Sequence, residues 1–143
     1  MKLRKAIKED IVFIEKLLKK NKLPYEDISS KIDCFYICSI GEKIIGIGGL
    51  EIHGDYGLLR SLVIIEHYRK RGYGKILTQK IIEYAKKKGL KEVYLLTTTA
   101  KEFFEKIGFE IVNRNAVPLE IRNSTEFKYL CPSTAVCMRL KLN

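Results

Sequence analysis

The sequence predicts one α+β domain over residues 1–143, built on a mixed sheet with helices on both of its faces. Two observations lead to this class. Three strand-like runs follow one another across short glycine turns in the first half, which predicts an antiparallel meander. Helical and strand-like segments then alternate in the second half. With 46% hydrophobic residues, the chain can form one modest core.

The first half begins with a strand and a helix. Helical spacing of Ile11, Ile14 and Leu18 predicts the helix, and Pro24 ends it. From Leu58 the third run of the meander is nearly all apolar, which predicts burial on both faces. The expected elements are a strand over residues 2–7, helices over 8–21 and 25–31, and strands over 34–39, 43–53 and 56–65.

The second half begins with a basic, glycine-bearing loop over residues 67–75, which leads directly into a helix. Gly89 follows three lysines and is expected to close that helix. The remaining elements are expected as strands over 93–98, 109–113 and 134–142, a helix over 100–107, and a loop with one helical turn over 118–130.

The net charge of +10 leaves three classes of partner open: nucleic acid, an anionic membrane surface and a polyanionic small molecule. No apolar run approaches the ~18 residues that span a bilayer, and the N-terminus is charged, so we expect a cytoplasmic protein without a membrane partner. A zinc finger, an RNP-like aromatic motif and a helix-turn-helix pattern are lacking, so we expect no nucleic-acid partner.

The four cysteines form no C-x-x-C pair, and the chain has only two histidines. A structural zinc site needs closer pairs of ligands, so we expect no metal site. We expect Cys34, Cys38, Cys131 and Cys137 to be free thiols of a reduced compartment.

The most informative motif is Arg69-x-x-Gly72-x-Gly74, between a strand and a helix. The unpaired N–H groups of a helix N-terminus bind anions, and glycine lets the backbone approach a phosphate closely. Lys70, Arg71 and Lys75 add positive charge. The spacing fits neither a Walker A loop nor a dinucleotide fingerprint. It fits the [RQ]-x-x-G-x-[GA] signature that holds the pyrophosphate of coenzyme A; the alternative is an ordinary turn with exposed basic residues.

Together with the segment Ala100-x-x-Phe103-Phe104-x-x-x-Gly108-Phe109, this loop resembles the GNAT acetyltransferase superfamily along the whole chain. The resemblance implies a mostly antiparallel sheet of about seven strands and about four helices. It also implies two central parallel strands, over 58–65 and 93–98, that splay apart around acetyl-CoA. The residues that it assigns to the cofactor are Leu62, Val63 and Ile64 for the pantetheine arm, and Arg69, Lys70, Arg71, Gly72, Tyr73, Gly74 and Lys75 for the pyrophosphate.

Four shorter stretches resemble the arsenic-resistance N-acetyltransferases: LLRSL at 58–62, YLLTTTA at 94–100, VPLEIRNSTEF at 117–127 and LCPSTAV at 130–136. The Leu-Thr-Thr segment and the tail also resemble the N-acetylglutamate-synthase type of amino-acid N-acetyltransferase. These resemblances imply acetyl transfer from acetyl-CoA, with CoA as product, to the primary amine of a small amino-acid-like acceptor. An organoarsenical or another toxic amino acid would fit this description.

One position departs from the family pattern. Many GNAT enzymes have a tyrosine that protonates the departing thiolate, and here Phe104 occupies its place. Thr97 is our candidate for a hydroxyl at this step, with Tyr94 and Thr98 beside it in the sequence. The alternative is that water supplies the proton. A further alternative is that the chain is a CoA-binding sensor with impaired catalysis.

The acceptor amine must lose a proton before it attacks the thioester, and Glu51 is the candidate base. The alternative is a surface residue beside a turn, and Glu120 and Glu126 are weaker candidates.

Arg60 lies in an apolar strand, so it must pair with a charge of the chain or bind an anion. One hypothesis is that Arg60 binds an acceptor carboxylate, helped by Arg122; the other is an ion pair with Glu51. Ser61, Cys131 and Ser133 are candidates for the lining of the acceptor pocket. The closing strand offers an edge for a homodimer.

Overall fold

The computed structural model describes residues 1–130 and 132–142. The predicted α+β class is confirmed: the strands form a seven-stranded sheet in the order β1-β2-β3-β4-β5-β7-β6. The strands are β1 (Lys2–Lys5), β2 (Phe35–Ile40), β3 (Lys43–His53), β4 (Tyr56–Ile64), β5 (Glu92–Thr97), β6 (Glu110–Ile111) and β7 (Val136–Lys141). Most of the described pairings are antiparallel, whereas β4 and β5 pair in parallel over Tyr56, Gly57 and Leu58.

The helices follow the expected places along the chain. They are α1 (Ile11–Lys20), α2 (Ile28–Lys31), α3 (Tyr73–Lys87), α4 (Lys101–Ile107) and α5 (Leu119–Arg122). Short 3-10 segments lie at Lys8–Asp10, Ile32–Cys34, Glu66–Tyr68 and Arg114–Ala116, and a π-helical turn lies at Glu126–Leu130. In the part of the chain that is described, no helix is long and apolar enough to cross a membrane.

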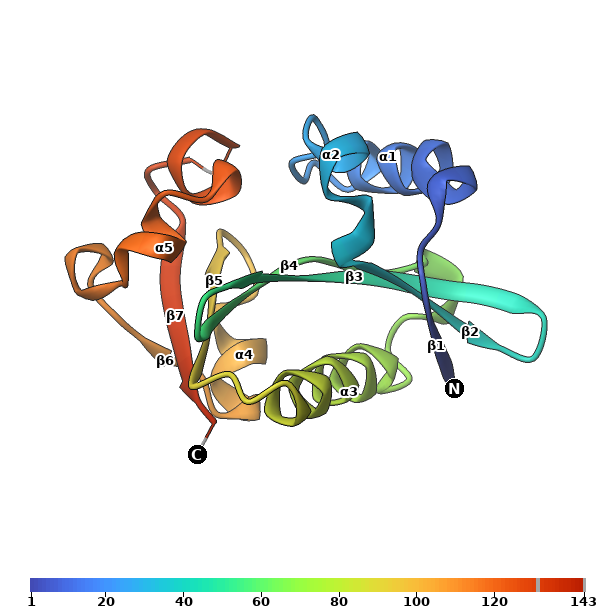
Figure 1. The fold of residues 1–143 in the computed structure, drawn as a ribbon. Helices are drawn as coiled ribbons and strands as arrows, with labels where there is room; N and C mark the ends of the chain where they lie inside the picture. Colours follow the sequence, from blue (N-terminus) through green and yellow to red (C-terminus); the bar gives the residue numbers. More distant parts are fainter. Residues whose placement is uncertain (131, 143) are drawn as a thin grey trace. The chain divides into compact units, whose positions relative to one another are not determined.

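The chain divides into two compact units. The first comprises residues 1–51 and 60–81, and the second comprises residues 52–59 and 82–143. In the first unit, α1 and α2 cover one face of β2 and β3, and the first half of α3 lies on the other face (Figure 1). Its core includes Ala6, Ile14, Leu18, Ile28, Phe35, Ile37, Ile47 and Val63. Burial of Ile14 and Leu18 agrees with the helical spacing in the sequence.

The second unit is built on β5, β7 and β6. β5 pairs with β7 over its full length, from Glu92 opposite Lys141 to Thr97 opposite Val136. Its core includes Leu58, Tyr94, Val117, Ile121, Phe127 and Cys137. The segment with α5 and the π-helical turn therefore packs its apolar residues against β5 and β7.

Two elements are shorter than their sequence patterns predict. The helical piece expected at 25–31 begins only at Ile28, and the strand expected at 109–113 is the two-residue β6. The second difference has a local cause. Gly108 has a φ of 123° and the N–H of Phe109 donates to the carbonyl of Phe104, so Phe109 closes α4 instead of entering the strand.

Candidate functional site

The loop that precedes α3 contains two residues in the left-handed region. Lys70 has a φ of 63° and Gly72 a φ of 82°, and α3 starts at the next residue, Tyr73. Such turns bring successive backbone N–H groups to one side of the chain, where they can bind an anion. A Cβ added at Gly72 would meet nothing within 4 Å, so the glycine is required by its backbone conformation rather than by lack of space.

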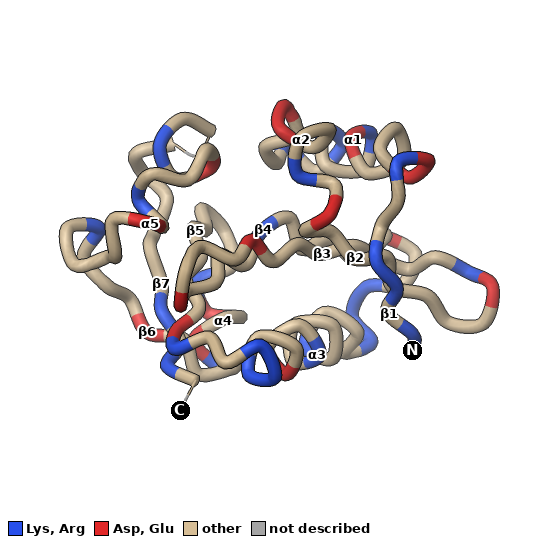
Figure 2. The backbone as a smooth tube through the Cα atoms, in the orientation of Figure 1, with Lys and Arg blue, Asp and Glu red and all other residues tan. Residues whose placement is uncertain are grey.

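Positive charge surrounds this turn. Lys70, Arg71 and Lys75 are all exposed, and Figure 2 shows the basic segment between β4 and α3 in blue. The first turn of α3 has N–H groups without an intrahelical partner, and the helix is 15 residues long. The loop is therefore suited to bind a phosphate group.

Arg69 belongs to the same motif but bonds to the protein itself. Its Nε donates to the carbonyl of Ile64 at 2.7 Å, and its Nη2 donates to Oδ1 of Asn21 at 2.8 Å. Asn21 follows the last turn of α1, and its Nδ2 donates to the carbonyl of Leu17. In this structure Arg69 thus fixes the start of the loop to the end of β4 and to the end of α1.

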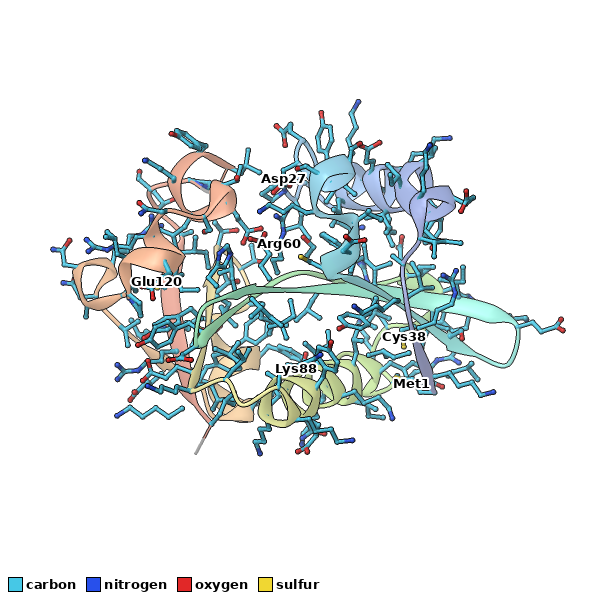
Figure 3. All side chains as sticks on the ribbon, viewed as in Figure 1. Met1, Asp27, Cys38, Arg60, Lys88 and Glu120 are labelled. Atoms are coloured by element: carbon cyan, nitrogen blue, oxygen red, sulfur yellow. The ribbon has the colours of Figure 1, made fainter. Side chains whose placement is uncertain are left out.

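A second feature of the same unit is a buried cluster of charges around Arg60. Its Nη1 lies 2.5 Å from Oδ2 of Asp27 and 2.9 Å from Oε2 of Glu51, and its Nη2 lies 2.9 Å from Oδ1 of Asp27. Figure 3 shows Asp27 and Arg60 approaching each other from α2 and β4. The ion pair with Glu51 that the sequence left as one alternative is present, and the bidentate partner of Arg60 is Asp27.

Close packing surrounds this arginine. The guanidinium carbon lies 5.5 Å from the centre of the Phe35 ring, and Nε donates to Oγ of Ser61 at 3.0 Å. A Cβ added at Gly49 would come within 3.2 Å of both the Phe35 ring and Cγ of Arg60. A side chain at position 49 would therefore require the Phe35 ring or the Arg60 side chain to move by a few tenths of an ångström.

Glu51 is almost completely buried, with 1% of its surface exposed. Its Oε2 accepts from Arg60, and its Oε1 lies 3.7 Å from Nζ of Lys31, which is partly exposed. Burial and the charge of Glu51 together raise the pKa of the neighbouring Cys34 thiol, with burial the larger cause. The sequence alternative of an exposed residue beside a turn does not describe this carboxylate.

The strand between the two features has an unusual backbone. Ser61 has a φ of 60°, which is rare for a non-glycine residue and rarer inside a strand. The residues that follow it, Leu62, Val63 and Ile64, are half-buried or buried and lead to the loop at Arg69. A residue in this conformation locally alters the direction of the strand.

In the second unit, Thr97 ends β5 and its Oγ1 accepts from the N–H of Ala100 at 2.9 Å. This bond shapes the entry to α4. Tyr94 is buried, and its hydroxyl donates to Glu92 at 2.7 Å; burial is the main reason that its pKa is raised far above the usual value. Phe104 is buried, with its ring 5.0 Å from Phe103 and 5.6 Å from Phe109.

The tail of the second unit contains Arg122 at the end of α5. Its Nε is buried, and within the described residues it has no hydrogen-bond partner. A buried guanidinium nitrogen without a partner is costly, which makes it a candidate to receive an anion. Glu126 is buried, Ser133 is exposed, and Cys131 lies outside the described residues. Among residues 1–130 and 132–142, no three His, Cys, Asp or Glu side chains gather in a way that could hold a metal ion.

Two of the hydrogen-bond partners in the charge cluster and in the loop before α3 could not be recognised from the sequence. Asp27 lies 33 residues from Arg60, and Asn21 lies 48 residues from Arg69. Neither belongs to a motif, and Asp27 stands at a helix start, where aspartate ordinarily caps the helix.

Comparison with known proteins gives consistent matches. The sequence profile of the acetyltransferase (GNAT) family matches residues 6–109. An uncharacterised N-acetyltransferase of Chlorobaculum tepidum is 26% identical over 118 residues, which cover 81% of this chain and 73% of that protein. An amino-acid acetyltransferase of Photorhabdus laumondii is 28% identical over 97 residues, which cover 66% of this chain but only 22% of that protein.

Solved structures agree in fold. N-acetylglutamate synthase from Neisseria gonorrhoeae, complexed with coenzyme A and L-arginine, superposes with a TM-score of 0.85 at 22% identity, covering 99% of this chain and 33% of that one. A protein from Mycobacterium tuberculosis in complex with CoA superposes with a TM-score of 0.83 at 22% identity, covering 100% of both chains.

Proposed function

Because the chain belongs to the GNAT family of acetyltransferases, it is an acetyl-CoA-dependent N-acetyltransferase, and we propose that its acceptor is the primary amine of a small, amino-acid-like molecule. The observation that carries the acceptor class is the buried, unpartnered Nε of Arg122 in the described chain, which suits an anionic group. The match to an amino-acid acetyltransferase supports the same class.

We propose that the loop before α3 binds the pyrophosphate of acetyl-CoA. The backbone N–H groups from Lys70 to Gly74, with Tyr73 among them, would donate to its oxygens, and the exposed charges of Lys70, Arg71 and Lys75 would attract it. Arg69 would act by holding this loop in place, because its side chain already donates to Ile64 and Asn21.

The pantetheine arm would pair with the backbone of Leu62, Val63 and Ile64. These residues follow directly on Ser61, whose left-handed conformation locally redirects the strand. Acetyl-CoA supplies the activated acetyl thioester, and the remaining chemistry is proton transfer and orientation.

Glu51 is our candidate base. The ammonium group of the acceptor loses a proton to the carboxylate, directly or through one water, and the amine lone pair then attacks the thioester carbonyl carbon. As the carbon–nitrogen bond forms and the carbon–sulfur bond breaks, the nitrogen would lose a second proton and the departing thiolate would take one up, so that the products are the N-acetyl compound and CoA. We propose that the Thr97 hydroxyl, which accepts from Ala100 N–H, donates a hydrogen bond to this thiolate.

We propose that Arg122, rather than Arg60, receives the anionic group of the acceptor. Both Nη atoms of Arg60 already donate to carboxylates of the chain, so Arg60 is assigned to holding Glu51. The narrower resemblance to arsenic-resistance N-acetyltransferases remains a prediction, as does the N-acetylglutamate-synthase type. An oxyanion on an arsenical amino acid would suit a guanidinium equally well.

An acceptor screen tests this proposal. Release of free thiol from acetyl-CoA is followed with glutamate, other α-amino acids, organoarsenical amino acids, polyamines and alkylamines. We expect turnover to require an anionic group on the acceptor. Arg122→Lys should raise the acceptor KM roughly ten- to a hundredfold, as expected when a charge-assisted bond worth about 1.5–3 kcal/mol is lost.

Arg139→Lys, at the pair of the partly exposed Arg139 with the exposed Glu110, is the matched control and should leave this KM unchanged. A plain alkylamine or polyamine that turns over best would contradict the acceptor class. Binding of acetyl-CoA without turnover on any amine would favour the sensor alternative. Pairing of two copies through the closing strand stays a prediction, which light scattering of the eluted protein checks.

A further inference from the structure

Asp27 has no role in the reaction described so far, yet it is placed unusually. It stands at the N-cap of α2, and within the described residues its side chain makes no capping hydrogen bond. Aspartate at this position ordinarily accepts from the N–H groups of the first turn. Here both carboxylate oxygens face Arg60 instead, at 2.5 and 2.9 Å.

Arg60 is shared between two carboxylates. Its Nη1 donates to both Asp27 and Glu51, so the plane of the guanidinium that Asp27 fixes also fixes where Oε2 of Glu51 lies. All three residues are at least nine-tenths buried. At such short distances and low exposure, the charge of Asp27 acts strongly on Arg60 and, through it, on Glu51.

Charges of both signs lie close to Glu51. Glu51 pairs with Arg60 from β4 and with Lys31 from the end of α2, and Asp27 at the start of α2 shares Arg60 with it. The Cys34 thiol lies near enough for the charge of Glu51 to raise its pKa, and the exposed Asp33 precedes it in the 3-10 turn. Asp27 and Glu51 carry two negative charges, and Arg60 and Lys31 carry two positive ones. Removing the charge of Asp27 makes the surroundings of Glu51 more positive, and removing that of Lys31 makes them more negative.

We propose that Asp27 and Lys31 are positioning residues that set the basicity of Glu51 from opposite sides, Asp27 through Arg60 and Lys31 directly. This inference rests on the proposed role of Glu51 as the base. By drawing part of the Arg60 charge to itself, Asp27 leaves Glu51 a stronger base than it would be as the sole partner of that arginine.

The test is the pH dependence of kcat at saturating acetyl-CoA and acceptor, with the best acceptor of the screen. Asp27→Asn keeps the shape of the side chain and removes its charge. We expect the acidic limb of the profile to move to lower pH by about one unit, with a lower plateau, because a weaker base ionises earlier and abstracts protons more slowly. Lys31→Met should move the same limb to higher pH.

Asp33→Asn is the matched control, because Asp33 is an exposed acid whose charge is screened by solvent, and it should leave the limb in place. Because Lys31 is partly exposed, we expect Lys31→Met to fold, so the positioning role can still be tested if Asp27→Asn does not fold. A lowered melting temperature with an unmoved limb in either variant would overturn the positioning role.

Glu51→Gln separates this inference from the proposed mechanism. If that variant loses most of kcat and the acidic limb, Glu51 is the base, and the other variants judge the positioning alone. If it keeps both, the base assignment itself is wrong, whatever the effects of Asp27→Asn and Lys31→Met on stability.

Discussion

Replacing Gly72 by aspartate and by asparagine separates the two demands that the cofactor loop makes on this position. Gly72 has a φ of 82°, and an added Cβ meets nothing within 4 Å, so both variants have room. A non-glycine residue in the left-handed region costs about 1–2 kcal/mol, and Asn and Asp tolerate it better than most. The two side chains share this cost and differ in charge.

The charge makes the larger difference. Two like unit charges 4 Å apart repel by about 1 kcal/mol in water and by about 4 kcal/mol near a protein surface. Because a pyrophosphate is multiply charged, Gly72→Asp should bind CoA at least about tenfold more weakly than Gly72→Asn, since 1.4 kcal/mol is a factor of ten. Asparagine alone should weaken binding only severalfold.

Calorimetric titration with CoA, at low and at high salt, measures both affinities, and circular dichroism checks that the variants are folded. The difference in CoA affinity between the two variants should become smaller at high salt, because salt screens the exposed charges. Equal affinities for the two variants would refute the assignment of this loop to the pyrophosphate.

Three further predictions concern other parts of the chain. Phe104→Tyr adds only a hydroxyl to a buried ring; if thiolate protonation limits turnover, steady-state thiol release should become faster, and an unchanged or slower rate means that another donor already serves. Burial raises the pKa of the Cys137 thiol to about 11, so at pH 8 only about one thiol in a thousand is ionised, and alkylation by iodoacetamide, read by mass spectrometry, should be far slower than in urea. The hydrogen bond from Arg4 lowers the pKa of Asp10, so the stability that this pair adds should be present above pH ~4 and be lost as pH falls through the lowered pKa. Urea unfolding of Asp10→Asn should show a loss of at most about 1 kcal/mol at pH 7, because Arg4 is exposed, and no loss at the acidic end.

Local patterns predicted most of the fold. The strand expected over residues 43–53 coincides with β3, and the helix after the basic loop ends before Gly89, which has a φ of 78°. The strand expected over 109–113 is shorter at both ends than predicted, and each end has a local cause. Phe109 closes α4, and Oδ1 of Asn113 accepts from the N–H of Asn115, which turns the chain away.

The candidate site divides in the same way. The phosphate loop is a contiguous motif and can be found in the sequence. The pairing of Arg60 with Glu51 could also be predicted from the sequence, because the two residues lie on successive strands of a meander. Asp27 could not be foreseen, because its partner is fixed by where α2 rests on the strands and not by any spacing along the chain. Arg69 fits its motif by residue type, but its hydrogen bonds to Ile64 and Asn21 require the folded unit.

The segment between α1 and α2 is fastened at both ends to the part of the chain that begins with β4. Asn21 is bonded to Arg69, and Asp27 is bonded to Arg60. Because both ends of the segment are held by hydrogen bonds, it must span a fixed distance, and six residues of extended chain reach no further than about 20 Å. We therefore expect deletion of a residue near Leu23 to disturb one of the two hydrogen bonds, although most connections on protein surfaces accept such changes. The length of this segment should vary less among working homologues than its amino acids do.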